Sequence, residues 1–260
     1  MSDKTMNLRT TTMLQTLPLL TALLLSALLP AHAAEPDVTR LLADADRFRV
    51  SDEQLVIETR VNTFKSDGTP DKERLYTVHT STGRRSLVLM RSPAEQGQKV
   101  LMVGDDFWLM MPGTQRPMRI TPSQKLLGDA STGDIATLRW SEDYRATLVG
   151  EERCDSTPCW HLSLAAQRPG VSYQRIELWL GRDRHQPLKA DLYLQSDKLA
   201  KQARFIPDSA ERPTQIDEMV LQDQLSHHRE TRVRYTARAK KVVPESWFNP
   251  MSLARNPTLE

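Results

Sequence analysis

The sequence predicts a mainly β protein: a strongly bent antiparallel sheet or barrel of about ten or eleven strands, with a short helical insert and an N-terminal helix. Two observations favour this class. Runs of alternating apolar and polar residues recur between turn residues, and no strand–helix–strand rhythm separates them. The third observation is an interruption between Thr121 and Arg139, where the pattern becomes short and helical before β chemistry resumes at Arg145.

The first residues have the pattern of an export signal. A basic start precedes the mostly apolar run 17–29, and Ala31-His32-Ala33 matches an A-x-A cleavage site. The apolar run is shorter than the roughly 20 residues of a spanning helix, which disfavours the alternative of an uncleaved anchor. We therefore expect export, removal of residues 1–33 as a cleaved signal peptide, and a single domain over residues 34–260.

The elements of this domain follow from periodicity. Pro36 to Asp46 reads as a short amphipathic helix, because its apolar residues recur at helical spacing. A meander of strands follows, with Gly104-Asp105 placed where a hairpin turn is expected. The tail from Val242 onward has turn character, and its two aromatic residues, Trp247 and Phe248, are expected to dock on the domain.

The expected strands are the alternating runs. They cover residues 55–61, 74–80, 86–91, 100–103, 107–111, 146–151, 160–166, 171–180, 188–194, 199–206, 214–221 and 230–237. One aliphatic face per strand indicates a bent sheet around a core. At this strand number a barrel has room for an apolar ligand cavity, and a flattened, fully packed core is the alternative.

The interruption contains two helix starts. Thr121 is suited to cap a helix with Pro122 at its first position, and a second start is plausible from Ser131 to Asp134. Helices of one or two turns are marginal alone and need an apolar surface beneath them. The insert is therefore either a lid over a hydrophobic cavity or a static plug that completes the core.

Cys154 and Cys159 are the two cysteines of the chain. In an exported protein the expected state is a disulfide, which here would clamp the end of a hairpin. The alternative, a redox pair, is disfavoured because the spacing is C-x4-C instead of C-x-x-C.

Catalytic and metal-binding patterns are not found. The chain carries no G-x-S-x-G, no glycine-rich phosphate loop and no H-E-x-x-H, so we expect neither an enzyme nor a cofactor. Asp105-Asp106 is interpreted as part of a hairpin turn and not as a carboxylate pair. His227 and His228 would point to opposite sides of a strand, which disfavours a metal site.

The charge of the chain argues against nucleic acid as a partner and leaves a membrane surface possible as one. The formal net charge is only +2, so no bulk field points to nucleic acid. A basic run extends from Arg229 to Lys241. Its ordinary meaning is a solvated strand face or a guarded sheet edge, and the alternative is transient contact with anionic lipid headgroups at a membrane surface.

Three segments carry a resemblance to a known family. They read M-V-G-D-D-F-W-L-M-M-P, R-P-M-R-I-T-P-S-Q-K-L-L-G-D-A-S-T-G-D and Y-R-A-T-L-V-G-E-E, and the ending W-F-N-P-M-S-L also fits. The chain from about Val50 to Leu253 resembles the outer-membrane lipoprotein-sorting group of the periplasmic LolA/LolB-like carrier superfamily. The resemblance implies a half-open antiparallel barrel closed by short helices, with an apolar cavity for acyl chains.

The function implied is that of a periplasmic carrier or chaperone for lipoproteins or other acylated lipids. Its partners would be acyl chains and an outer-membrane acceptor or inner-membrane transporter. The alternative is a periplasmic accessory or sensor protein of such a transporter or of a signalling protein, with the same fold but no lipid cargo. Alternation and position suggest eight lining residues: Leu87, Leu89, Leu101, Val103, Leu126, Leu127, Ile135 and Leu138.

Overall fold

The computed structural model describes Met1 and residues 36–50, 54–127, 129–135, 139–168, 170–224 and 230–254. The helix expected from Pro36 to Asp46 is present as α1 (Val38–Arg47). Asp37 caps it, because its carboxylate accepts hydrogen bonds from the backbone N–H groups of Thr39 and Arg40 at 3.0 and 3.2 Å. The apolar stripe of α1 is buried, as its helical spacing predicts.

The described residues include a 13-stranded antiparallel sheet and a 2-stranded one, so the mainly β class is confirmed. In chain order the strands of the large sheet are β1 (Leu55–Phe64), β2 (Pro70–Ser81), β3 (Arg85–Met90), β4 (Lys99–Val103), β5 (Asp106–Met110), β6 (Met118–Ile120), β9 (Tyr144–Cys154), β10 (Thr157–Ala166), β11 (Arg175–Gly181), β12 (Pro187–Tyr193), β13 (Leu199–Pro207), β14 (Ile216–Asp223) and β15 (Glu230–Lys240). The sheet exceeds the expected strand number, and β6 is too short for alternation to reveal it.

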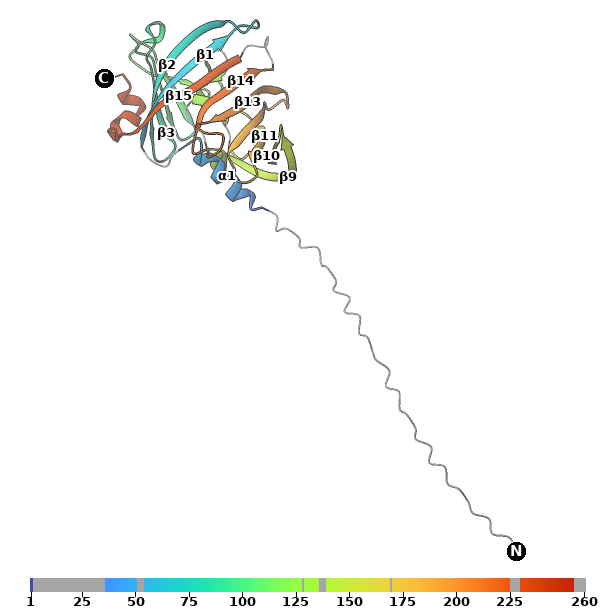
Figure 1. Cartoon of the computed structure of the whole chain (residues 1–260). Coiled ribbons are helices and arrows are strands. Elements are labelled where there is room, and N and C mark those ends of the chain that lie inside the picture. Colours follow the sequence, from blue (N-terminus) through green and yellow to red (C-terminus); the bar gives the residue numbers. More distant parts are fainter. Residues whose placement is uncertain are drawn as a thin grey trace. The chain divides into compact units, whose positions relative to one another are not determined.

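The order in space is β6-β5-β4-β3-β2-β1-β15-β14-β13-β12-β11-β10-β9. The first and last strands of the chain therefore pair at the middle, with Val61 opposite Val233. Among the described strands, β6 and β9 each have one neighbour, so the barrel is not closed. Figure 1 shows β13, β14, β15, β1 and β2 in this order and α1 beside the sheet.

The segment between the two edge strands is the interrupted stretch of the sequence, residues 121–143, which we call the insert. It contains β7 (Lys125–Leu127), β8 (Ala130–Ser131), α2 (Thr132–Ile135) and α3 (Trp140–Asp143). The second helix start is confirmed by α2. The first is wrong: the chain turns after Thr121, whose carbonyl accepts from the Gln124 N–H at 3.0 Å, and then pairs as β7 with β8.

The two faces of the sheet are buried under different covers. The inner face packs against α1, the insert and the opposite strands in the main hydrophobic core. The outer face of β2–β5 packs under the C-terminal tail, residues 242–254, which forms two short 3₁₀ helices, η2 (Glu245–Phe248) and η3 (Pro250–Ser252). Figure 1 shows the tail against the strands marked β2 and β3, as expected for its aromatic residues.

Candidate functional site

A small cavity lies where the insert meets the inner face of the sheet. Its volume is about 40 Å³. Most of its lining is aromatic or aliphatic, and it includes Trp140, Tyr144, Tyr173, Ile176, Phe205 and Met219. Pockets that hold small molecules usually enclose about 300–1,000 Å³. In this conformation this cavity is therefore too small to hold such a molecule.

A buried ion pair joins the insert to the wall at this cavity. Asp134 of α2 and Lys201 of β13 lie 2.8 Å apart, and each side chain is only 7% exposed. The backbone N–H and the hydroxyl of Ser131 donate to the same carboxylate oxygen at 2.9 and 2.6 Å. The hydroxyl of Tyr173 donates to the other oxygen at 3.1 Å.

Burial and charge act in opposite directions on this carboxylate. Burial by itself raises the pKa of Asp134, but the Lys201 ammonium and the hydrogen bonds from Ser131 outweigh it, so the pKa is lowered. Burial, together with the Asp134 charge, raises the pKa of Tyr173 well above its usual range. At neutral pH Asp134 is therefore ionised and Tyr173 is a neutral phenol.

A second polar contact fixes the β7–β8 hairpin. Lys125 Nζ lies 2.8 Å from the Asp223 carboxylate of β14, and the backbone N–H of Asp129 donates to the Thr231 hydroxyl at 2.9 Å. Burial, reinforced by the nearby Asp223, raises the pKa of Asp129. Charged and polar groups thus hold the insert to β13, β14 and β15 alongside its apolar contacts.

Gly133 of α2 marks a close approach. A Cβ at this position would lie 2.5 Å from the Ser172 hydroxyl oxygen and 3.2 Å from the Pro122 carbonyl oxygen. A side chain at position 133 would therefore require the Ser172 side chain to move and the Pro122 carbonyl to shift slightly. The Ser172 hydroxyl is buried and has no hydrogen-bond partner among the described residues, and it lines both the small cavity and a neighbouring one of about 200 Å³.

The last part of the insert is anchored to α1. The buried carboxylate of Asp46 accepts from the backbone N–H groups of Trp140 and Ser141 at 3.0 and 2.8 Å. The guanidinium of Arg49 lies 3.7 Å from the centre of the Trp140 ring. These bonds satisfy the first N–H groups of α3, so α1 caps α3 and holds it at this end of the sheet.

Asp105 and Asp106 form part of the β4–β5 turn, as interpreted from the sequence. The Asp105 carboxylate accepts from Arg84 at 3.2 Å and from Arg168 at 3.3 Å. Arg84 also binds the fully buried carboxylate of Asp143 at 2.6 Å. Asp106 pairs with Arg119 on β6. The two acidic side chains are therefore used in separate ion pairs and do not form one carboxylate site.

The structure divides the eight suggested lining residues between two places. Ile135 is buried in the inner core, and Leu126 packs against it partly buried. Leu87, Leu89, Leu101 and Val103 lie on the outer face, under the tail. Leu127 belongs to β7, but its side chain and all of Leu138 lie outside the described part of the chain. The four outer residues are thus not brought together with the insert.

The physical reason is that β3–β5 are apolar on both faces. Tyr76, Val88 and Val100 point inward, while their neighbours Leu87 and Leu101 point outward, and all are buried. Alternation separates the two faces but does not say which is concave. The correct inner residues of these strands were the alternate set: Tyr76, Val78, Val88, Met90, Val100, Met102 and Phe107.

The outer cluster also buries a histidine. His79 is 3% exposed, and its ring lies edge-on to Trp247 with the ring centres 5.2 Å apart. Burial, aided by the positive charges of Lys241 and Arg91, lowers the pKa of His79 to about 4. The imidazole is therefore neutral at pH 7 and packs as an apolar group beneath the tail.

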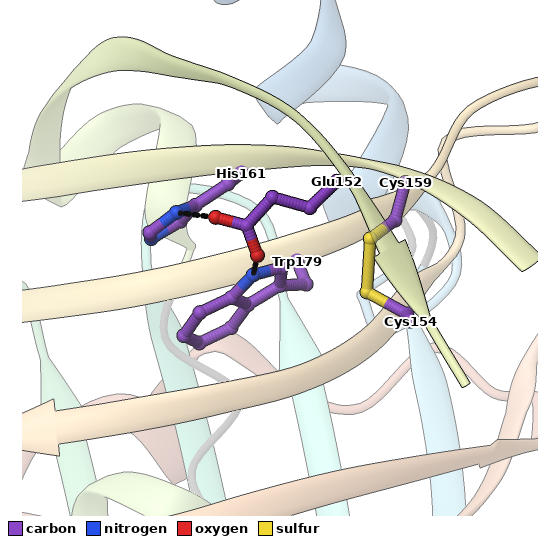
Figure 2. Close-up of a disulfide and its surroundings, with 5 residues drawn as sticks. All are labelled: Glu152, Cys154, Cys159, His161 and Trp179. Atoms are coloured by element: carbon purple, nitrogen blue, oxygen red, sulfur yellow. Dashed lines mark hydrogen bonds and ion pairs between the residues drawn. A yellow bond between two sulfur atoms is a disulfide. The ribbon is translucent and has the colours of Figure 1, made fainter.

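The disulfide between Cys154 and Cys159 is confirmed, with Cα atoms 5.9 Å apart. Figure 2 shows it beside the outward-facing ring of Trp179, whose indole N–H donates to Glu152 at 2.8 Å. His161 stacks on this ring at 4.3 Å and bonds Glu152 and Glu177 at 2.7 and 2.9 Å. These contacts join β9, β10 and β11 next to the disulfide.

The charges of the basic run on β15 are partly neutralised by acidic residues of β14. Arg234 lies 2.6 Å from Glu218, and Arg238 lies 3.5 Å from Asp217. His227, His228 and Arg229 lie outside the described residues. In the described part of the chain, no group of histidine, cysteine and acidic residues is placed to hold a metal ion. No helix described is long and apolar enough to cross a membrane.

Comparison with known proteins places this architecture. A family model, whose members are described as uncharacterized proteins, matches residues 82–255. A LolA superfamily protein from Nitrosomonas europaea is 27% identical, with a TM-score of 0.74 over 81% of this chain and 96% of that chain. The chain belongs to that family and to the LolA-like superfamily.

Two further structures have the same fold as this LolA-like chain. A putative outer membrane lipoprotein-sorting protein domain from Vibrio parahaemolyticus has 15% identity and a TM-score of 0.68, covering 84% of this chain and 98% of its own. A DUF1329 family protein from Desulfovibrio piger has 22% identity and a TM-score of 0.67, covering 83% and 97%. No curated protein sequence matches the chain.

Asp134 and Lys201 were not predicted from the sequence to form a pair. A signal for Lys201 exists, because it alternates with Ala203 and Phe205 and so points to the inner face. A buried ammonium requires a nearby acidic partner, which predicts that some carboxylate reaches it. The sequence does not say which one, because Asp134 lies 67 positions away.

Proposed function

We propose that this LolA-like protein is a periplasmic carrier or chaperone that binds acyl chains of lipoproteins or other lipids against the inner face of its sheet. The observation that carries the proposal is the nature of the inner cover. An open sheet with an apolar concave face is covered by short segments of the insert, and not by further strands of the large sheet. Such segments are marginal alone and can leave the surface on which they lie.

Binding requires a change of shape. The cavity of about 40 Å³ is too small for an acyl chain, so the insert must move for the inner face to become accessible. Binding of an acyl chain is then favoured by about 25 cal/mol for each Å² of apolar surface that is removed from water. Affinity stays moderate, because each binding event also breaks contacts of the insert, and this suits a carrier that releases its cargo.

The direct test is extraction of bound lipid. The protein is purified without detergent from a Gram-negative periplasm, and its organic extract is analysed by mass spectrometry alongside titration with a diacylated peptide. We expect stoichiometric lipid or binding of the peptide. If neither is observed, the carrier function is wrong.

Lys125→Met tests whether the insert opens. Loss of the contact with Asp223 weakens the closed form, so the diacylated peptide should bind up to about tenfold tighter or faster. Lys198→Met is a matched control, since it removes one exposed lysine on the turn before β13. Lower stability of Lys125→Met without any gain in binding would show that the insert is a static plug.

The small cavity favours a second candidate. A protein whose inner face stays filled acts through its surface, as an accessory or sensor that binds another periplasmic or membrane protein. The same titration separates the two functions: the second requires that neither the wild type nor Lys125→Met binds the diacylated peptide.

A further inference from the structure

A basic groove lies at the end of the sheet where α1 ends. It has a volume of about 320 Å³ and lies between the segment after α1 and the ends of β1 and β15. Its described lining includes four cationic residues and no acidic one: Arg47, Arg49, Arg238 and Lys240. The carboxylates that pair with the arginines, Asp44, Asp46 and Asp217, are not part of this lining.

Two of the guanidinium groups are held in place before any ligand arrives. Arg49 is stacked on Trp140 and lies 3.3 Å from Asp46, and its side chain is 15% exposed. Arg238 lies 3.5 Å from Asp217 with 17% of its side chain exposed, and it bonds the Ile216 carbonyl oxygen. Fixed guanidinium groups lose little entropy when they bind a phosphate or carboxylate oxyanion.

The floor of the groove is apolar. Phe48 and Leu55 line it partly buried, and Ile57 lines it from the inner core. A charged rim over an aliphatic floor suits a ligand that has both an anionic group and a hydrocarbon part, and it suits a free inorganic ion less well.

Arg49 connects this groove with the interior. It lines the groove and also the small cavity next to Trp140, Phe205 and Met219. A molecule with its head between Arg49 and Arg238 therefore has its chain beside the apolar surface that the proposed function requires. The cavity of about 200 Å³ also meets the small cavity, at Ser172 and Tyr173, but its described lining includes the acidic Asp223, whereas the described lining of the groove includes no acidic residue.

We propose that this groove binds the anionic head, a phosphate or carboxylate oxyanion, of the acylated ligand whose chain enters the interior beside Arg49. The inference rests on the proposed function and adds a ligand class to it: single- or double-chain lipids with a negatively charged head. Zwitterionic lipids with the same chains bind more weakly, because their cationic group meets the arginines.

The test compares two lysolipids with the same acyl chain by isothermal titration calorimetry. Lysophosphatidic acid carries a phosphate monoester and lysophosphatidylcholine a zwitterionic head. We expect the purified protein to bind the former about tenfold more tightly at low salt. The preference should shrink as ionic strength rises, because the charges meet at a solvent-accessible rim.

Arg238→Gln combined with Lys240→Gln removes two cations from the rim and leaves Arg49 on Trp140. This variant should bind both lysolipids with affinities within about threefold of each other. Arg60→Gln is the matched control, because Arg60 is an exposed arginine of β1 paired with Glu73 and lies outside the groove's lining. It should keep the tenfold preference.

Each outcome decides between the possibilities. Equal binding of both lysolipids by the wild type, or a preference that survives in the double variant, overturns the headgroup site and leaves the carrier function standing. Failure of both lysolipids and the diacylated peptide to bind overturns the carrier function itself. Inorganic phosphate that binds the wild type as tightly as lysophosphatidic acid shows a site for the free ion and overturns the lipid assignment.

Discussion

The insert and the C-terminal tail each cover one face of the same sheet, but different forces hold them. The insert is held by a buried pair, Asp134–Lys201, whose side chains are each 7% exposed. The tail buries Phe248 and Leu253 beside Leu87 and Leu101, and its ion pair, Arg85–Glu245, is largely exposed on the acidic side.

The insert and the tail therefore differ in how readily they can leave the sheet. A buried ion pair often stabilises a fold no more than a well-packed apolar pair does, yet removal of only one of its two partners is costly. An element held in this way has one well-defined position, and a ligand that makes other contacts with the sheet can displace it. A tail held by apolar burial behaves as part of the core. Four predictions test this contrast, in decreasing order of expected effect.

The largest effect is expected for Asp134→Leu. It leaves the Lys201 ammonium buried without its partner, so the free energy of unfolding should fall by about 3–5 kcal/mol in urea titrations. Asp134→Leu combined with Lys201→Met removes both charges and should recover most of this loss. A loss below about 1 kcal/mol for the single variant would contradict the role of the pair.

Phe248→Ala tests the apolar cover. Its side chain is 4% exposed, and its removal should lower the free energy of unfolding by about 3–4 kcal/mol while leaving binding at the inner face unchanged. Met251→Ala is the control on the same tail, since Met251 is 72% exposed and should have almost no effect. Reduced binding of acylated peptide in Phe248→Ala would show that the two covers are coupled.

His79 makes the outer cover sensitive to pH. Its pKa of about 4 in the fold lies below the ordinary value near 6.5, so the unfolded chain binds the proton more tightly. The stability that the neutral ring contributes is present above pH 6.5 and is lost as the pH falls toward 4. Allowing for solvent near the ring, the loss is about 2 kcal/mol.

The measurement is the free energy of unfolding between pH 7 and 4 for the wild type and His79→Phe. The difference between the two proteins should be nearly constant above pH 6.5 and should change in favour of the variant below it. Parallel curves over the whole range would contradict a buried, neutral His79.

The smallest effect is expected for Arg85→Gln. Its partner Glu245 is 70% exposed, so loss of the ion pair should cost less than about 1 kcal/mol and should matter less at high salt. A double-mutant cycle with Glu245→Gln gives the coupling energy directly. A coupling above about 2 kcal/mol would show that charge, and not apolar burial, fixes the tail.

Alternation and turn chemistry were sufficient for most of the fold. They predicted α1, the strands longer than about five residues, the turn at Gly104-Asp105 and the docking of Trp247 and Phe248. The resemblance to LolA-like proteins is confirmed by the comparisons. These features can be recognised from the periodicity and turn residues of short stretches of sequence, without knowledge of the contacts that those stretches make in the fold.

The insert was harder, because its structure is decided by its surroundings. Thr121 to Gln124 has helix-start chemistry, but the backbone turns there and Lys125–Leu127 pairs with Ala130–Ser131. Such short segments have no strong conformational preference of their own, so their contacts with the inner face of the sheet determine their conformation.

By itself, then, the sequence determined a mainly β chain with one interruption, a disulfide and a pattern typical of an export signal. Only the tertiary structure decided which apolar face of β3–β5 is concave, and therefore that Leu87 and Leu101 lie under the tail while Val88 and Val100 face the interior. It also decided that Asp134 meets Lys201 and that Arg49 and Arg238 line the same groove. Periodicity along a strand records that two faces differ, whereas the curvature of the sheet and contacts between distant segments exist only once the chain has folded.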